Sequence, residues 1–187
     1  MEDTKSSEVS RVGRHIVVAA LATAATLGAA NAGAADMFLK IGDIKGESTD
    51  AKHRDEVDVL AWSWGVNGPA AGDSKKTSVP ACSEPLLVEK RVDLATPQLA
   101  SGAALNTTYP TATLVVRRPG AKQPTEAVVL NLKGVTVKSL VNGGDAEGEM
   151  KEQLKLGYAS ATFTYTAQKA DGSPGASVSG NAPASCP

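Results

Sequence analysis

The sequence is poor in the side chains that most catalytic and metal sites require. Its 187 residues include two histidines and two cysteines, and only 4% are aromatic. Since His15 lies in an alanine-rich leading segment, His53 is the only histidine in the rest of the chain, and its charged turn predicts a solvated side chain. One histidine and two distant cysteines cannot build a Cys/His metal cluster or a catalytic triad. We therefore predict that the protein is not an enzyme and has no catalytic residue, metal or cofactor.

An excess of charge and the common ligand-binding motifs are lacking as well. The chain has 19 Lys and Arg residues against 20 Asp and Glu residues, for a net charge of -1. Nucleic-acid binding depends on cationic side chains that neutralise phosphates, so we expect no nucleic-acid partner. Residues 142–149 lack the Lys-Ser/Thr pair of a phosphate loop and the regular acidic ladder of an EF-hand. This segment is predicted to be a plain hairpin loop.

Residues 1–35 have the order of a secretory signal peptide. A charged start is followed by the uncharged run 16–30 and by small residues with two Ala-x-Ala cleavage triplets. The run is shorter than the roughly 20 apolar residues of a membrane-spanning helix. We expect cleavage just before Asp36 and a secreted or periplasmic bacterial protein with no membrane span. The alternative is an extension without a targeting role, because the leading charges cancel.

Alternation of apolar and polar side chains predicts a mainly β domain over residues 36–170. Strands are expected at residues 36–42, 56–66, 86–92, 111–118, 126–140 and 154–168. One short helix of about two to three turns is expected over 97–105, because Thr96 offers a side-chain cap and Pro97 suits the first turn. The Gly/Pro/Ser/Lys-rich segment 67–85 is predicted to be a loop. The Gly/Ser/Pro-rich segment 171–187 is predicted to be a flexible tail.

The two long predicted strands each change phase along their length. In 126–140 the apolar residues move from even to odd positions beside Gly134, and in 154–168 they do so after Tyr158. A phase change beside a glycine is typical of a β-bulge. Long strands that bend in this way are typical of a sheet that curls towards a barrel.

The two cysteines, Cys82 and Cys186, lie in the predicted loop and tail. In an exported protein a pair of cysteines favours one disulfide, which would tether the tail to the loop. Two separate thiols, or disulfides between subunits, are the alternatives.

Two segments near the start of the predicted domain carry a specific family resemblance. Residues 36–48 read DMFLKIGDIKGES and residues 56–65 read EVDVLAWSWG. They closely resemble the opening of the Hcp (haemolysin-coregulated protein) family, the tube proteins of type VI secretion systems. The similarity continues through TPQL at 96–99, LKGV at 132–135 and FTYTAQ at 163–168.

The resemblance implies a small β-barrel of two antiparallel sheets with one flanking α-helix. It also implies a homo-oligomer, in which hexameric rings stack into a tube. Its partners would be sheath proteins, a VgrG-like spike and small effectors carried in the lumen. Closing a ring requires a heterologous interface, in which different surfaces of neighbouring subunits meet. Candidate ring-to-ring contacts are the loop 67–85 and the charged turn with Glu47, Asp50 and His53; candidate contacts within a ring are Thr96, Pro97 and Leu99.

The predicted leader separates this chain from the usual pattern of the family, whose tube proteins are loaded in the cytoplasm without one. The Cys82 and Cys186 pair, which suits an oxidising compartment, points in the same direction. The function favoured is a type VI tube subunit. One alternative is a separately exported Hcp-like protein that forms extracellular rings or fibres without the contractile apparatus. An enzyme or toxin on the same scaffold is a third, less favoured reading.

Overall fold

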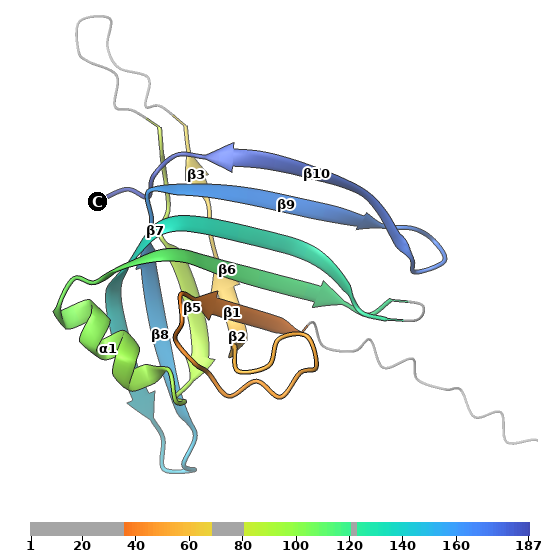
Figure 1. Ribbon diagram of the computed structural model, residues 1–187. Helices are drawn as coiled ribbons and strands as arrows, with labels where there is room; N and C mark the ends of the chain where they lie inside the picture. The colour runs from red at the N-terminus through yellow and green to blue at the C-terminus, as the bar shows by residue number, and fades with distance from the viewer. Residues whose placement is uncertain (1–35, 69–80, 121–122) are drawn as a thin grey trace, which may run out of the picture. The chain divides into compact units, whose positions relative to one another are not determined.

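The computed structural model describes residues 36–68, 81–120 and 123–187 (Figure 1). The predicted leader, its cleavage site and residues 69–80 of the predicted loop lie outside the described residues. No described helix is long and apolar enough to cross a membrane. The elements are β1 (Met37–Ile41), β2 (Val57–Ser63), β3 (Val66–Asn67), β4 (Cys82–Ser83), β5 (Leu86–Arg91), α1 (Thr96–Ala104), β6 (Thr108–Arg118), β7 (Thr125–Gly144), β8 (Met150–Gly157), β9 (Ser160–Gln168) and β10 (Pro174–Ala182).

Six of these strands close into a barrel. The main sheet has the order β10-β9-β7-β6-β1-β2-β5-β8, and β8 pairs a second time with β7. The strands β7, β6, β1, β2, β5 and β8 therefore form a closed circuit, while β9 and β10 extend the sheet outward from β7 (Figure 1). A short second sheet pairs β3 with β4. The predicted mainly β barrel with one helix is confirmed.

The long strand β7 belongs both to the barrel and to the outward extension. Its first half pairs with β9 over residues 128–133, and its second half pairs with β8 from Thr136 onward. The buried side of the strand changes beside Gly134, as the sequence predicts: Leu132 is buried before it and Val135 after it. Gly134 has φ +59°, a conformation that glycine adopts without steric cost.

The predicted β-bulge beside Gly134 is misplaced. The register of β7 against β8 shifts between Val137 and Ser139, several residues later. At Gly134 the buried side changes through the left-handed backbone conformation, and no residue is inserted there. The bulge lies further along the strand, between Val137 and Ser139.

The predicted strand 154–168 is two strands rather than one. β8 ends at Gly157 and β9 begins at Ser160, and the buried Tyr158 lies in the break between them. The register of β9 against β7 continues into β8 as far as Val137, and the Ala159 N–H donates to the Lys133 carbonyl across the break at 2.8 Å. The phase change predicted after Tyr158 is this break.

Strand β2 changes its buried face at a register shift against β5, located between Val59 and Ala61. Val57 and Val59 are buried before the shift, whereas Trp62 and Trp64 pack against the core after it. Residues on opposite faces of the strand, Val57 and Val59 before the shift and Trp62 after it, thus reach the same core.

Helix α1 packs on the barrel through its buried Leu99. Its start differs from the prediction, because the N-cap residue is Ala95 and no side chain caps the helix. Thr96 is the first helical residue, and its hydroxyl donates to Glu152 Oε2 at 3.0 Å inside the protein. The side chain expected to cap the helix is therefore committed to a buried polar cluster.

The segment predicted to be a flexible tail contains a strand instead. β10 pairs with β9 from Pro174 to Ala182. Three hydroxyl or amide contacts link the same two strands: Thr162–Asn181, Thr164–Ser179 and Thr166–Ser177, at 2.8–3.0 Å. A composition rich in Gly and Ser hid this strand, because it offers no apolar alternation.

Candidate functional site

The predicted contact residues differ in what they can present to another molecule. Glu47 and Pro97 are exposed, and Asp50 is partly buried. The other three, His53, Thr96 and Leu99, are buried. Their side chains can support the residues at the surface but are not available for direct contact with another molecule. The prediction that His53 is a solvated turn residue is therefore wrong.

His53 is buried because it packs against the barrel strand that precedes it. Its ring stacks on the Phe38 ring with centroids 4.3 Å apart. Its Nδ1 lies 2.9 Å from Glu56 Oε2, and its Nε2 lies 4.0 Å from Glu126 Oε1. The Phe38 ring in β1 and the Glu56 carboxylate, three residues after His53, thus hold the turn against the sheet.

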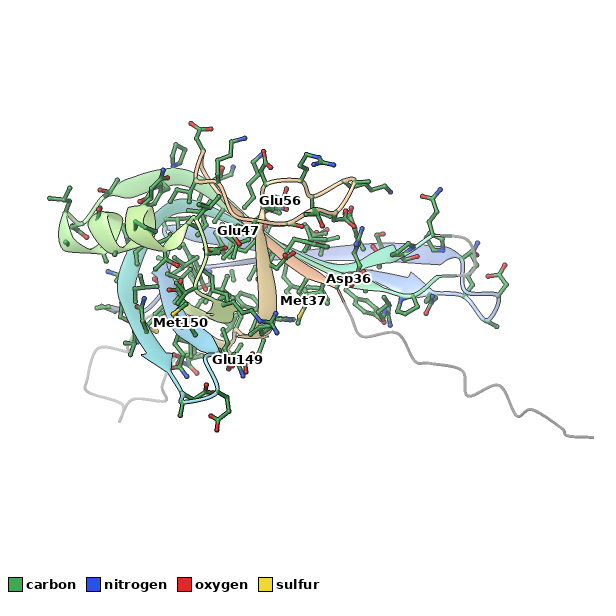
Figure 2. All side chains as sticks on the ribbon, turned by 90° about the horizontal axis from the view of Figure 1, so that it is seen from below. Asp36, Met37, Glu47, Glu56, Glu149 and Met150 are labelled. Carbon is green, nitrogen blue, oxygen red and sulfur yellow. A yellow bond between two sulfur atoms is a disulfide. The ribbon has the colours of Figure 1, made fainter. Side chains whose placement is uncertain are left out.

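The same turn is fixed by an ion pair with β6. Arg117 donates to both carboxylate oxygens of Asp50, at 3.2 and 2.6 Å. These hydrogen bonds hold the pKa of the Asp50 carboxyl down at about 2. Arg117 also donates to Asp36 at 3.1 Å and lies over the Phe38 ring. These contacts hold the turn in a fixed position against the barrel. Figure 2 shows Glu47 and Glu56 near each other in this part of the molecule.

A buried polar cluster sets the position of α1. Lys90 of β5 and Glu152 of β8 are direct cross-strand partners, and the Nζ–Oε1 distance is 2.7 Å. The Lys90 ammonium also lies 2.6 Å from Asp93 Oδ1 and donates to Thr96 Oγ1 at 3.3 Å. Because a buried ammonium is costly unless it is fully partnered, this cluster defines where the helix can begin.

The described residues do not bring together a metal-binding group. Within 36–68, 81–120 and 123–187, no three His, Cys, Asp or Glu side chains are placed to hold an ion. The described residues do present surfaces that another chain could contact.

The free edge of β10 is the most extended such surface. β10 hydrogen-bonds to β9 on one side only and ends the order of the main sheet (Figure 1). Its nine residues carry no charge, and Val178 is 70% exposed. Exposed edges normally carry lysines, prolines or bulges that prevent pairing with another chain. Apart from Pro174 and the register shift beside it, β10 has none of these, so it can accept a further strand.

Sequence reasoning missed this edge, although one signal for it was present. Threonine alternates at 162, 164 and 166, and serine alternates at 177 and 179. This period of two is the pattern of a strand, but it is carried by hydroxyl side chains instead of apolar ones. The strands predicted from apolar alternation therefore do not include β10.

Other exposed apolar side chains are scattered over the described surface. Leu94 and Leu105 flank the two ends of α1, and Val141 and Met150 lie on the β7–β8 hairpin. Figure 2 shows Met150 with Glu149 at this hairpin, on the far side from Glu47. Exposed apolar groups thus occur at several sites among the described residues. Of the sites named here, only β10 also offers the free edge of the main sheet.

Comparison with known proteins gives one consistent result. The family model described as "Type VI secretion system effector, Hcp" matches residues 38–165. A Pseudomonas aeruginosa protein named hcp1 is 38% identical over 146 residues, which cover 74% of this chain and 88% of that protein.

Solved structures agree with this sequence match. A structure described as a type six secretion system protein has a TM-score of 0.69 at 27% identity, over 78% of this chain and 92% of that chain. Hcp1 from Salmonella typhimurium has a TM-score of 0.68 at 25% identity, over 81% of this chain and 99% of that chain. A type VI secretion system effector from Yersinia pestis has a TM-score of 0.64 at 27% identity, over 79% and 99%.

Proposed function

Because the chain belongs to the Hcp family of type VI secretion tube proteins, we propose that it is a structural tube subunit whose copies join into hexameric rings. The observation that carries this proposal is the extent of the family match. Residues 38–165 run from β1 into β9 and include every strand of the closed barrel. Stacked rings would form a tube, with sheath proteins, a VgrG-like spike and small effectors as partners.

We place one side of the ring contact at the free edge of β10. A ring is closed by a heterologous interface, in which one surface of a subunit meets a different surface of its neighbour. An uncharged edge strand of nine residues supplies one such surface, through main-chain hydrogen bonds to a strand of the next copy. The positioned turn with Glu47 and Asp50 remains our candidate for contacts between stacked rings.

The edge assignment is tested by placing a charge on it. Val178→Lys puts an ammonium group on the free edge, where lysine blocks pairing with another chain. Val141→Lys is the matched control, because Val141 is similarly exposed (62% against 70%) but lies on β7 near the β7–β8 hairpin. Negative-stain micrographs and size-exclusion chromatography with light scattering should show hexameric rings for the wild type and for V141K.

V178K should give mostly monomers with an unchanged circular dichroism spectrum. Rings formed by V178K as readily as by wild type would refute the edge assignment. A wild-type protein that stays monomeric under all conditions would refute the ring itself.

We further propose that residues 1–35 are a leader removed close to Asp36. Support comes from the order of charged, apolar and small residues, and from the start of β1 at Met37. Mass spectrometry of the natural protein should find its first residue within a few positions of Asp36. A natural protein that retains residues 1–35 would refute this.

Export by a leader favours a second candidate function, a separately exported ring or fibre protein. The two functions differ in their dependence on the type VI apparatus. Deletion of a type VI baseplate gene should abolish release of a tube subunit into the medium, and it should leave release of a separately exported protein unchanged.

A further inference from the structure

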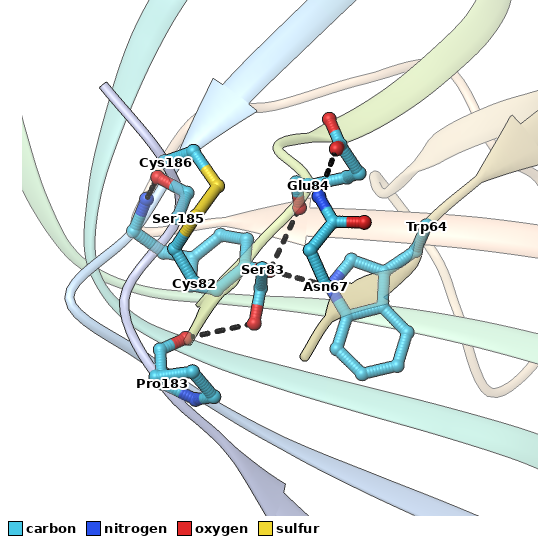
Figure 3. Close-up of a disulfide and its surroundings, with 9 residues drawn as sticks. Trp64, Asn67, Cys82, Ser83, Glu84, Pro183, Ser185 and Cys186 are labelled. Carbon is cyan, nitrogen blue, oxygen red and sulfur yellow. Dashed lines mark hydrogen bonds between the residues drawn. A yellow bond between two sulfur atoms is a disulfide. The ribbon is translucent and has the colours of Figure 1, made fainter. Parts of the chain in front are cut away.

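A short segment after β10 is hydrogen-bonded to two other parts of the chain. Residues 183–186, here called the strap, run beside β4 and the break between β8 and β9 (Figure 3). The Cys186 N–H donates to the Ser83 carbonyl at 2.7 Å, and the Ser83 N–H donates to the Ala184 carbonyl at 3.0 Å. On the other side, the Ser185 N–H donates to the Tyr158 carbonyl at 2.9 Å, and its hydroxyl accepts from the Tyr158 N–H at 3.0 Å.

A disulfide between Cys82 and Cys186 closes the strap onto β4. The two Cα atoms are 5.1 Å apart, within the range that a disulfide spans, and the cysteines are 104 positions apart in the sequence. Both cysteines are only partly buried. The strap is therefore held by a bond that depends on the redox environment.

The strap begins immediately where β10 ends. Ala182, the last residue of β10, is buried, and it is the only residue of β10 that is. The strand is otherwise held by its ladder with β9 and by the hairpin turn, where the Lys169 N–H donates to the Ser173 carbonyl at 2.9 Å. An edge strand with so few buried contacts belongs to the part of a protein that opens first. Its attachment at the Ala182 end thus depends on the strap.

We infer that the Cys82–Cys186 disulfide is a redox switch for self-assembly. The oxidised chain keeps the β10 edge in place for the next copy, whereas the reduced chain lets β10 fray from Ala182 and assembles poorly. In the oxidation step, two thiols lose two protons and two electrons to the disulfide of a thiol oxidant, such as oxidised glutathione, and form the S–S bond. The inference rests on the second candidate function, a separately exported ring or fibre protein, because a tube subunit loaded in the cytosol would have to assemble in its reduced form.

The switch suits a protein that crosses a membrane before it assembles. Dithiols stay reduced in the cytosol and are oxidised outside it. A chain that reaches the oxidising compartment would acquire its assembly edge only there, which prevents rings from forming before export.

The first test compares assembly of the purified protein, produced from the full 187-residue chain, in oxidised form and after reduction with excess dithiothreitol. Light scattering over a dilution series gives the concentration of half-assembly. If only about a tenth of reduced chains keep β10 in place, that concentration rises roughly tenfold, by the inverse of the competent fraction. Cys82→Ser and Cys186→Ser should behave like the reduced chain in both conditions. Ser83→Ala removes the hydroxyl that donates to the Pro183 carbonyl of the strap at 3.0 Å but retains the disulfide, so its assembly should still respond to reductant.

Hydrogen exchange separates local fraying from loss of the fold. Amides of β10 and of the strap should exchange faster after reduction, while amides of β5 and β8 keep their protection. Rings that assemble equally well in both redox states would overturn the switch and leave the tube function standing. Failure to assemble in either state would instead count against the ring. Loss of protection throughout the barrel on reduction would also overturn the switch, because the effect would then be global unfolding.

Discussion

The barrel and its extension are held together by different kinds of side-chain contact. The interior of the barrel holds fully buried leucines from β1, β5, β6, β7 and β8, together with the ion pair of Lys90 and Glu152. The extension, β9 and β10, has only Ala161 and Ala182 buried, and its strands are linked by hydroxyl and amide contacts. This difference assigns the stability of the fold to the barrel and leaves the extension available for contact with other chains.

Typical magnitudes support this division. Burying a leucine side chain contributes about 1.5–3 kcal/mol. A cross-strand contact between hydroxyl side chains contributes roughly 0.2–1 kcal/mol. Substitutions in the barrel should therefore act on the free energy of unfolding, whereas substitutions in the extension should act mainly on assembly.

The largest effect on unfolding is expected at the buried ion pair. Lys90→Met leaves Glu152 buried without its cation, and breaking a buried pair in this way costs about 3–5 kcal/mol. Urea unfolding, followed by the fluorescence of Trp62 and Trp64, measures the loss.

The double variant Lys90→Met/Glu152→Leu is the control for this experiment. It replaces both partners, which are opposite each other in β5 and β8, by apolar side chains, and it should recover most of the lost stability. A double variant that is less stable than Lys90→Met alone would mean that the polar cluster stabilises the fold by holding α1 in position, and that the Lys90–Glu152 ion pair alone does not account for its effect.

A smaller effect is expected at Gly134, where β7 passes from the extension to the barrel. Gly134→Ala forces alanine to adopt φ +59° and places its Cβ 3.0 Å from the Ala159 Cβ. Strain of this kind costs about 1–3 kcal/mol. Gly143→Ala, in the same strand but with open space around the added Cβ, should change the free energy of unfolding by less than about 0.5 kcal/mol. Equal effects at both positions, measured by urea unfolding, would show that the Gly134 conformation is not a constraint on the fold.

The same contrast between the barrel and its extension explains what could be predicted from the sequence. In a barrel strand such as β8, the buried Leu154 and Leu156 alternate with the exposed Gln153 and Lys155, so apolar alternation marks the strand directly. The extension buries little, so apolar alternation carries no signal for β10.

Contacts between distant segments were beyond sequence reasoning for a different reason. The burial of His53 depends on Phe38, which another strand brings to it. The partnership of Lys90 with Glu152 depends on the register of β5 against β8. Neither can be known before the strands are paired.

The smallest effect on unfolding is expected in the extension itself. Thr164→Val keeps a β-branched side chain but removes the hydroxyl that contacts Ser179 at 2.8 Å. Since the contact is exposed, the free energy of unfolding should fall by less than about 1 kcal/mol. A double-mutant cycle with Ser179→Ala isolates the pair, and its coupling energy should stay within the same limit. A coupling energy above about 2 kcal/mol would remove the contrast, because the extension would then stabilise the fold as strongly as the barrel interior does.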